Sequence, residues 1–211
     1  MQNEADCVIS AIDKEKDYLY CGKRVVCGRL YGEEVAVVVC GVGKANAASG
    51  AQYAIDLLGA DIIVNIGVAG GLNGSLKIGG VYAVGAAVQY DFDLTQLNGT
   101  AIGTLDEFKE NYLPLSVGRG FDVKKVATGD RFNDSRDDFL LLTEVLGADL
   151  REMELGAIAQ VCAHAGVKCY SFKAVSDLAG KGSTTEQFLK NLEICFNALK
   201  GGLEKIMKVT V

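Results

Sequence analysis

The stretch DIIVNIGVAG, residues 61–70, is apolar on both of the faces that a β-strand would present. Successive side chains of a strand point to opposite sides, so a strand of this kind has to be covered on both faces. Other apolar runs are also predicted to be strands, and together they predict a central sheet with helices on both faces. These runs are CVISAI (7–12), EVAVVVCG (34–41), GGVYAVGAAV (79–88), VKKVATG (123–129) and KCYSFKAVSD (168–177).

Helical patterns lie between the apolar runs. KANAASGAQYAIDLLG (44–59) predicts one helix, and ELGAIAQVCAHAG (154–166) predicts a buried helix that stops at Gly166. A last helix is predicted from Ser183, which has capping-box spacing to Glu186, to about Met207. The alternation predicts an α/β fold, and the absence of a linker or repeat predicts a single domain over residues 1–211.

The composition argues against several classes of protein. A net charge of −6 disfavours nucleic acid as a partner, because such binding requires a basic face. The sequence has no apolar run of about 18 residues and no signal-peptide pattern at its start, so we expect no membrane span. The seven cysteines form no CxxC pair, which is typical of buried thiols in a reducing cytoplasm. The lone His164 is expected to pack in a helix, and no metal site is predicted.

A pair of glycines separates a predicted strand from a predicted helix in VVVCGVGKANAA (37–48). A dinucleotide-binding fingerprint would require glycine or alanine at Asn46, and a Walker phosphate loop would require serine or threonine at Ala45. Both are missing, so we interpret the segment as a tight turn near a pocket.

A metal-dependent phosphatase is one hypothesis for the acidic motifs. Asp91, Asp93 and Thr95 in YDFDLTQ (90–96) match the nucleophile signature of haloacid-dehalogenase-type phosphatases, and GDRFND (129–134) resembles their metal-binding motif. Only about 40 residues separate the two motifs, too few for the intervening strands and helices of a doubly wound sheet. Several predicted strands also precede the first motif, so the topology argues against this hypothesis.

Three segments indicate a ligand pocket. NIGVAGGLNGSLKIGGVYAV (65–84) is rich in glycine, which lets main-chain amides approach a small ligand closely. Ser176 and Asp177 end an apolar strand, where open α/β sheets bind ligands, and burial would raise the pKa of Asp177; a helix cap is the competing interpretation. Glu152 and Glu154 bracket Met153 before a very apolar segment, and buried carboxylates need partners.

Taken together, these segments resemble the 5′-methylthioadenosine/S-adenosylhomocysteine nucleosidase family of the purine nucleoside phosphorylase superfamily. The resemblance runs from about residue 7 to residue 207, and its motifs follow the family's order. They are SAIDKE (10–15), CGVGKANAA (40–48), NIGVAGGL (65–72), YDFDLT (90–95), TGDRF (128–132), EMELGAIAQVC (152–162) and AVSD (174–177).

The resemblance implies a three-layer α/β/α fold of the phosphorylase/hydrolase type, with a central mixed sheet that is partly barrel-like. It implies hydrolysis of the N-glycosidic bond of methylthioadenosine and S-adenosylhomocysteine, with 5′-deoxyadenosine as a further substrate and adenine as a product. It also implies a cytoplasmic homodimer that needs no cofactor and acts in methionine salvage.

The resemblance implies a role for each of three carboxylates. Asp177, oriented by Ser176, would donate a proton to N7 of adenine, and Glu15 would take a proton from the attacking water. Glu154 would bind the ribose hydroxyls and stabilise the cationic sugar of an oxocarbenium-like transition state. Substrate-binding roles are implied for Met153, Glu152, Phe132, Asn133, Val68, Ala69, Gly70, Ala11 and Ile12.

The sequence departs from the family's pattern at Ile12 and Lys14 of the first motif, at Val68, where some members have serine, and at Tyr90, where relatives often have histidine. Gly79 stands where bacterial phosphorylases of the superfamily carry an arginine, so water rather than phosphate is the expected nucleophile. A purine nucleoside phosphorylase, a futalosine-type nucleosidase and a non-catalytic nucleoside-binding protein stay as alternatives.

Overall fold

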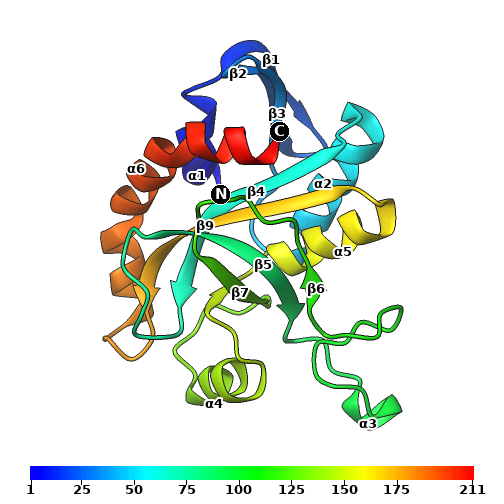
Figure 1. Ribbon diagram of the computed structural model, residues 1–211, viewed down its shortest axis with the longest axis vertical. Helices are drawn as coiled ribbons and strands as arrows, with labels where there is room; N and C mark the ends of the chain where they lie inside the picture. The colour runs from blue at the N-terminus through cyan, green and yellow to red at the C-terminus, as the bar shows by residue number, and fades with distance from the viewer.

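Five strands close into a barrel at the centre of the computed structural model, which describes residues 1–211 (Figure 1). The barrel strands are β4 (Ile62–Gly71), β5 (Val81–Gln89), β7 (Val123–Thr128), β8 (Leu150–Glu152) and β9 (Lys168–Leu178). β4 pairs in parallel with β9, which pairs antiparallel with β5; β5, β7 and β8 then follow in parallel, and β8 returns antiparallel to β4. The predicted mixed, barrel-like sheet is therefore confirmed.

Helices cover the barrel on both sides, as the apolar strands require (Figure 1). The long helix α6 (Thr184–Thr210) packs against β9 and β4 together with α1 (Gln2–Ile9), while α2 (Lys44–Leu58) and α5 (Leu155–Ala165) pack together on the other side. The remaining elements are α3 (Thr95–Asn98), β6 (Leu113–Pro114) beside β5, and α4 (Arg136–Leu140), which continues into the π-helical turn η1 (Leu141–Val145). No helix combines the length and the apolar character needed to cross a membrane.

The first forty residues differ most from the prediction. CVISAI (7–12) is not a strand: it lies largely in helix α1, in which Cys7, Val8 and Ile9 are buried. A short apolar run can be a buried helix face as readily as a strand, and here its position against α6 decides. β1 (Asp13–Tyr20), β2 (Lys23–Leu30) and β3 (Glu33–Val39) form a separate antiparallel sheet, so EVAVVVCG (34–41) is a strand outside the barrel.

Local signals at the helix ends are confirmed. Gly166 ends α5 with φ of 67°, the left-handed conformation that glycine adopts without strain. Ser183 caps α6 by accepting a hydrogen bond from the Glu186 main-chain N–H, although the helix ends at Thr210 rather than near Met207. All seven cysteines are free thiols, four of them buried.

The burial of α6 supplies a test of the packing. Leu203 is 1% exposed in a core cluster with Val8, Leu30 and Val68, whereas Leu189 on the same helix is 65% exposed. We expect Leu203→Ala to lower the free energy of unfolding by about 2–5 kcal/mol, because it leaves a cavity. Leu189→Ala should change it by less than about 0.5 kcal/mol in the same urea titration. Equal losses in both variants would contradict the packing of α6.

Candidate active site

A fully buried lysine organises one end of the barrel. Lys173 of β9 is 2% exposed, and its Nζ lies 3.0 Å from Oε2 of Glu152, which ends β8. Burial by itself opposes the charge of Lys173, but Glu152, Glu154 and Glu4 outweigh it and raise the pKa of the lysine. A buried ion needs such partners, so Lys173 and these three glutamates, which we term the carboxylate cluster, form one unit.

Glu152 answers why two glutamates precede an apolar helix. Its carboxylate accepts hydrogen bonds from the main-chain N–H groups of Glu154 and Leu155 at 3.0 and 2.8 Å, and one from the Thr128 hydroxyl. These donors include the free N–H groups at the start of α5, where negative charge is favourable. Glu152 therefore fixes the turn that presents Met153 and Glu154.

Glu154 is the N-cap residue of α5 and points its carboxylate toward the turn before α2. Its Oε1 accepts a hydrogen bond of 2.9 Å from the main-chain N–H of Gly43. Burial and the charge of Glu152 raise the pKa of Glu154, while Lys173 and the Gly43 N–H act in the opposite direction. The tight turn CGVGK thus supplies a main-chain donor to the site instead of binding a phosphate.

Glu4 of helix α1 is the third glutamate of the carboxylate cluster, and none of the sequence motifs includes it. Its Oε1 accepts a hydrogen bond of 3.0 Å from the Val68 N–H on β4. Gly67 permits this approach: a Cβ there would lie 3.0 Å from Glu4 Oε1 and 3.6 Å from Lys173 Nζ. The glycine-rich segment that was expected to border the ribose and water therefore carries a carboxylate beside it.

Asp177 is presented by a β-bulge. Gly70 pairs with Asp177 although Ala69 pairs with Val175, so Ser176 is the extra residue in β9. Ser176 donates a hydrogen bond of 2.8 Å to Oδ2 of Asp177, whereas Oδ1 is buried and has no hydrogen-bond partner. Burial raises the pKa of Asp177, which Ser176 and Arg151 partly offset. Asp177 is thus a 2% exposed carboxyl with one free oxygen.

That oxygen faces a small hollow of about 40 Å³, in which the structure brings together five of the predicted site residues. The lining residues are Gly70, Arg131, Phe132, Arg151, Glu152, Met153, Asp177 and Thr184. Ligand pockets usually exceed about 300 Å³, so a purine would have to displace side chains. Phe132 and Arg131 are both more than half exposed, although Phe132 packs against Phe188 and Arg131 pairs with Asp138.

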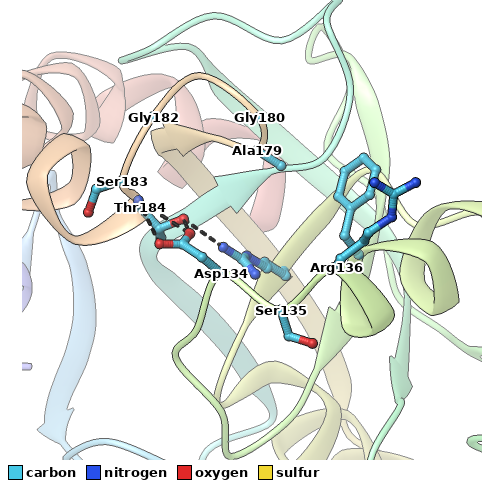
Figure 2. A pocket seen from close by; sticks show the side chains of 10 residues that line it. Asp134, Ser135, Arg136, Ala179, Gly180, Gly182, Ser183 and Thr184 are labelled. Atoms are coloured by element: carbon cyan, nitrogen blue, oxygen red, sulfur yellow. Dashed lines mark hydrogen bonds between the residues drawn. The ribbon is translucent and has the colours of Figure 1, made fainter.

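A larger hollow of about 350 Å³ adjoins the first and shares Arg151 and Thr184 with it. Its other lining residues include Asp134, Ser135, Arg136 and the loop from Ala179 to Ser183 (Figure 2). Figure 2 shows the side chains of Asp134 and Thr184 in contact with each other, joined by hydrogen bonds. None of the members of the carboxylate cluster lines this hollow, so we take the smaller hollow as the candidate active site.

Glu15 does not join the site, which corrects the role expected from the SAIDKE motif. It lies on β1, its side chain is 63% exposed, and its nearest charged partner is Arg29 at 3.9 Å. Ala11 and Ile12 of the same motif pack in the core beneath α6 instead of lining the hollow. Glu15 belongs to the polar strand β1, DKEKDYLY, whose residues are nearly all exposed on the small sheet.

The other predicted residues divide between the site and its support. Val68 and Ala69 are buried in β4 next to Gly70, and Val68 contributes its N–H to Glu4. The side chain of Asn133 is hydrogen-bonded at the start of α4. Its Nδ2 donates a hydrogen bond of 2.8 Å to Asp138, and its Oδ1 accepts one of 3.0 Å from the Ser135 N–H. Its side chain therefore does not line the hollow, and only main-chain contacts to a base are open to it.

The remaining acidic and histidine motifs have structural partners. Asp91 contacts Lys44 Nζ at 2.5 Å and accepts a hydrogen bond of 3.0 Å from the Asp130 N–H, and no group of three or more His, Cys, Asp or Glu side chains is arranged to hold a metal ion. His164 was expected to pack inside the protein. Its side chain is instead 56% exposed, and its Nε2 lies 2.9 Å from Oε1 of Glu107.

The chain is similar to known proteins both in sequence and in fold. Residues 13–207 match the family model described as the phosphorylase superfamily, and the chain belongs to that superfamily. The 5′-methylthioadenosine/S-adenosylhomocysteine nucleosidase of Geobacillus thermodenitrificans is 30% identical over 206 residues, covering 90% of this chain and 87% of that protein. Within the superfamily, the chain therefore belongs to this nucleosidase family, a family of N-glycosyl hydrolases.

Two further relatives bear on the site. The aminodeoxyfutalosine nucleosidase of Campylobacter jejuni is 31% identical over 159 residues, covering 70% of this chain and 69% of that protein. The crystal structure of the methylthioadenosine/S-adenosylhomocysteine nucleosidase of Colwellia psychrerythraea in complex with adenine superposes with a TM-score of 0.89 at 26% identity, covering 99% of this chain and 92% of that one. The family resemblance and the fold expected from the motifs are confirmed.

Removal of Lys173 tests the carboxylate cluster. In Lys173→Met, Glu152 loses its buried countercharge, and we expect a loss of about 3–5 kcal/mol in the free energy of unfolding at pH 7. Lys173 also opposes the rise in the pKa of Glu154 that burial and the charge of Glu152 cause, so without it the loss should grow as pH rises and shrink toward pH 5. Lys208→Met, which removes a 71% exposed lysine, is the control. A free energy of unfolding in Lys173→Met equal to that of the wild type would contradict the role of Lys173 as the buried countercharge of Glu152.

The raised pKa of Asp177 predicts a pH-dependent gain on its neutralisation. Because the ionised form is disfavoured in the folded state, Asp177 lowers stability as pH rises above its unfolded pKa. Asp177→Asn should therefore melt at a higher temperature than the wild type at pH 8, and the two curves should converge near pH 4. If the melting temperature of Asp177→Asn minus that of the wild type is lower at pH 8 than at pH 4, the raised pKa of Asp177 is contradicted.

Proposed function

We propose that this chain hydrolyses the N-glycosidic bond of 5′-substituted adenosines, with methylthioadenosine and S-adenosylhomocysteine as its substrates. The observation that carries the proposal is the buried, unpartnered Oδ1 of Asp177, which faces a hollow with Phe132 and Met153 next to the carboxylate cluster. The names of the Geobacillus and Colwellia relatives, and the adenine bound to the latter, support this choice of substrate.

The chemistry divides among three carboxyls. Asp177, with its raised pKa, donates a proton from Oδ1 to N7 of the base as the bond from N9 to C1′ breaks. Glu154 accepts hydrogen bonds from the ribose hydroxyls and stabilises the positive charge that develops on the sugar. Water adds to C1′ and gives its proton to a carboxylate on the side of the sugar away from the base.

For that base we propose Glu4 in place of Glu15. Glu4 shares Lys173 with Glu154 and is held by the Val68 N–H, whereas Glu15 is exposed on another sheet. A general base must come within hydrogen-bond reach of the proton that it removes, and Glu4 lies beside the other carboxylates whereas Glu15 does not. Phe132 packs on the base and Met153 on the sugar.

Water is the proposed nucleophile because the segment before β5 offers no arginine for phosphate. Lys77 is its one cation, and that side chain is exposed. A second subunit is proposed to complete the 5′ pocket, so the homodimer stays a prediction, as does a role in methionine salvage in the cytoplasm. A futalosine-type nucleoside is the second candidate substrate, supported by the likeness to the Campylobacter enzyme.

Release of free base is the direct test. Incubation with methylthioadenosine, followed by chromatography, should yield adenine at the same rate with and without phosphate. Strict phosphate dependence would indicate a phosphorylase, and intact nucleoside after long incubation would indicate a binding protein.

Matched glutamate variants test the assignment of the base. Asp177→Asn and Glu4→Gln should each lower kcat by about 10²–10⁴-fold, the usual contribution of a general acid or base. Glu15→Gln should stay within about twofold of wild type, as expected for an exposed surface residue. Loss of activity in Glu15→Gln with full activity in Glu4→Gln would reverse the assignment.

A further inference from the structure

Arg151 is a cation at the candidate base site that neither the sequence motifs nor the proposed chemistry uses. It lies in β8, pairs with Gly70 of β4, and lines the small hollow with Asp177 and Phe132. Its Nη2 is 4.0 Å from the free Oδ1 of Asp177, and its side chain is 15% exposed. Gly70 permits this close approach, since a Cβ there would meet Asp177 Oδ1 at 2.7 Å and Arg151 Nε at 3.2 Å.

A chain of hydrogen bonds fixes the guanidinium in this position. Arg151 Nη2 donates 3.0 Å to the hydroxyl of Thr184, and that hydroxyl donates to Asp134, as the dashed contacts between Asp134 and Thr184 in Figure 2 show. This is the one side-chain hydrogen bond of Arg151, although a guanidinium carries five N–H donors. Donors therefore remain to face a ligand in the hollow.

The position of Arg151 indicates which part of a base it would meet. Glu154, the proposed sugar ligand, belongs to the carboxylate cluster and contacts the turn at Gly43. Arg151 instead contacts Thr184 and also lines the larger hollow. If Oδ1 of Asp177 meets N7, Arg151 then faces the neighbouring substituent at C6, on the side away from the sugar. N7 and that substituent share one edge of a purine.

An arginine at this edge discriminates between two classes of purine. Guanidinium groups only donate hydrogen bonds, and they pair with the O6 and N7 acceptors of a 6-oxopurine, whereas adenine presents an amino donor at C6. Asp177 also presents Oδ2, but that oxygen already accepts one hydrogen bond from Ser176. An adenine amino group would thus point at a donor.

We infer that Arg151 is a specificity-determining residue that lets this site hydrolyse 6-oxopurine nucleosides at least as well as adenine nucleosides. The inference rests on the proposed function and adds a second leaving base to it. In the reaction water adds to C1′, the bond from C1′ to N9 breaks, and hypoxanthine leaves with the proton from Asp177 on N7 and the guanidinium on O6.

Paired substrates test the inference on one preparation of enzyme. We compare kcat/KM for 5′-methylthioinosine and 5′-methylthioadenosine, which differ only at C6, in wild type and in Arg151→Met. The ratio of the two values cancels any loss of folded protein. We expect a ratio of one or more in the wild type and a fall of about tenfold or more in Arg151→Met, from loss of one base contact. Arg136→Met, which removes an exposed arginine of the larger hollow, should keep the wild-type ratio.

The outcomes separate this inference from the proposed function. Hydrolysis of methylthioadenosine alone, or a ratio that Arg151→Met leaves unchanged, would overturn the inference and keep the function. If neither nucleoside is hydrolysed, the proposed function fails, and calorimetric titration with hypoxanthine and with adenine decides the inference: tighter binding of hypoxanthine that is lost in Arg151→Met supports it, and equal or weaker binding overturns it.

Discussion

The ion pair between Lys173 and Glu152 is the interaction on which the rest of the site depends. Both side chains are about 2% exposed, so neither charge is tolerable without the other. The pair joins β9 to β8 inside the barrel, and Glu152 also holds the first N–H groups of α5. Glu154 and Glu4 then gather around the same lysine. One buried cation thereby keeps three acidic groups close together, which would otherwise repel one another or take up protons.

Closure of the barrel gives the site its remaining groups. Pairing of β9 with both β4 and β5 fixes β9 at the centre, and the bulge at Ser176 turns Asp177 toward Gly70. Short β8 brings Arg151 and Glu152 to the same end, and the turn at Gly43 adds a main-chain donor from before α2. The proposed acid, the proposed sugar ligand and the proposed base thus come from elements far apart in the sequence. Few of these contacts are local, which is why a rigid closed sheet is needed to hold them.

The sequence predicted what depends on local pattern and missed what depends on tertiary position. The apolar runs identified β4, β5, β7 and β9, and Gly166 and Ser183 marked helix ends, because burial and backbone conformation leave a direct signature in residue type. Helix α1 was mistaken for a strand, and Glu15 was expected in the site although it is exposed on β1, since a short segment does not reveal what it packs against. The barrel was expected only from the family resemblance. The sequence does contain two signals of buried pairing that lie outside the recognised motifs. They are Lys173, within the apolar run KCYSFKAVSD, and Arg151, directly before Glu152.

The most direct test of the account is a crystal structure with a non-hydrolysable nucleoside analogue. The account predicts that the ribose hydroxyls bind Glu154, that N7 of the base meets Oδ1 of Asp177, and that Glu4 lies on the opposite face of C1′. Phe132 should have moved to cover the base, enlarging the small hollow. A nucleoside bound in the larger hollow by Asp134 and Arg136, with Oδ1 of Asp177 still unpartnered, would contradict the central claim that the buried carboxylates form one nucleoside site.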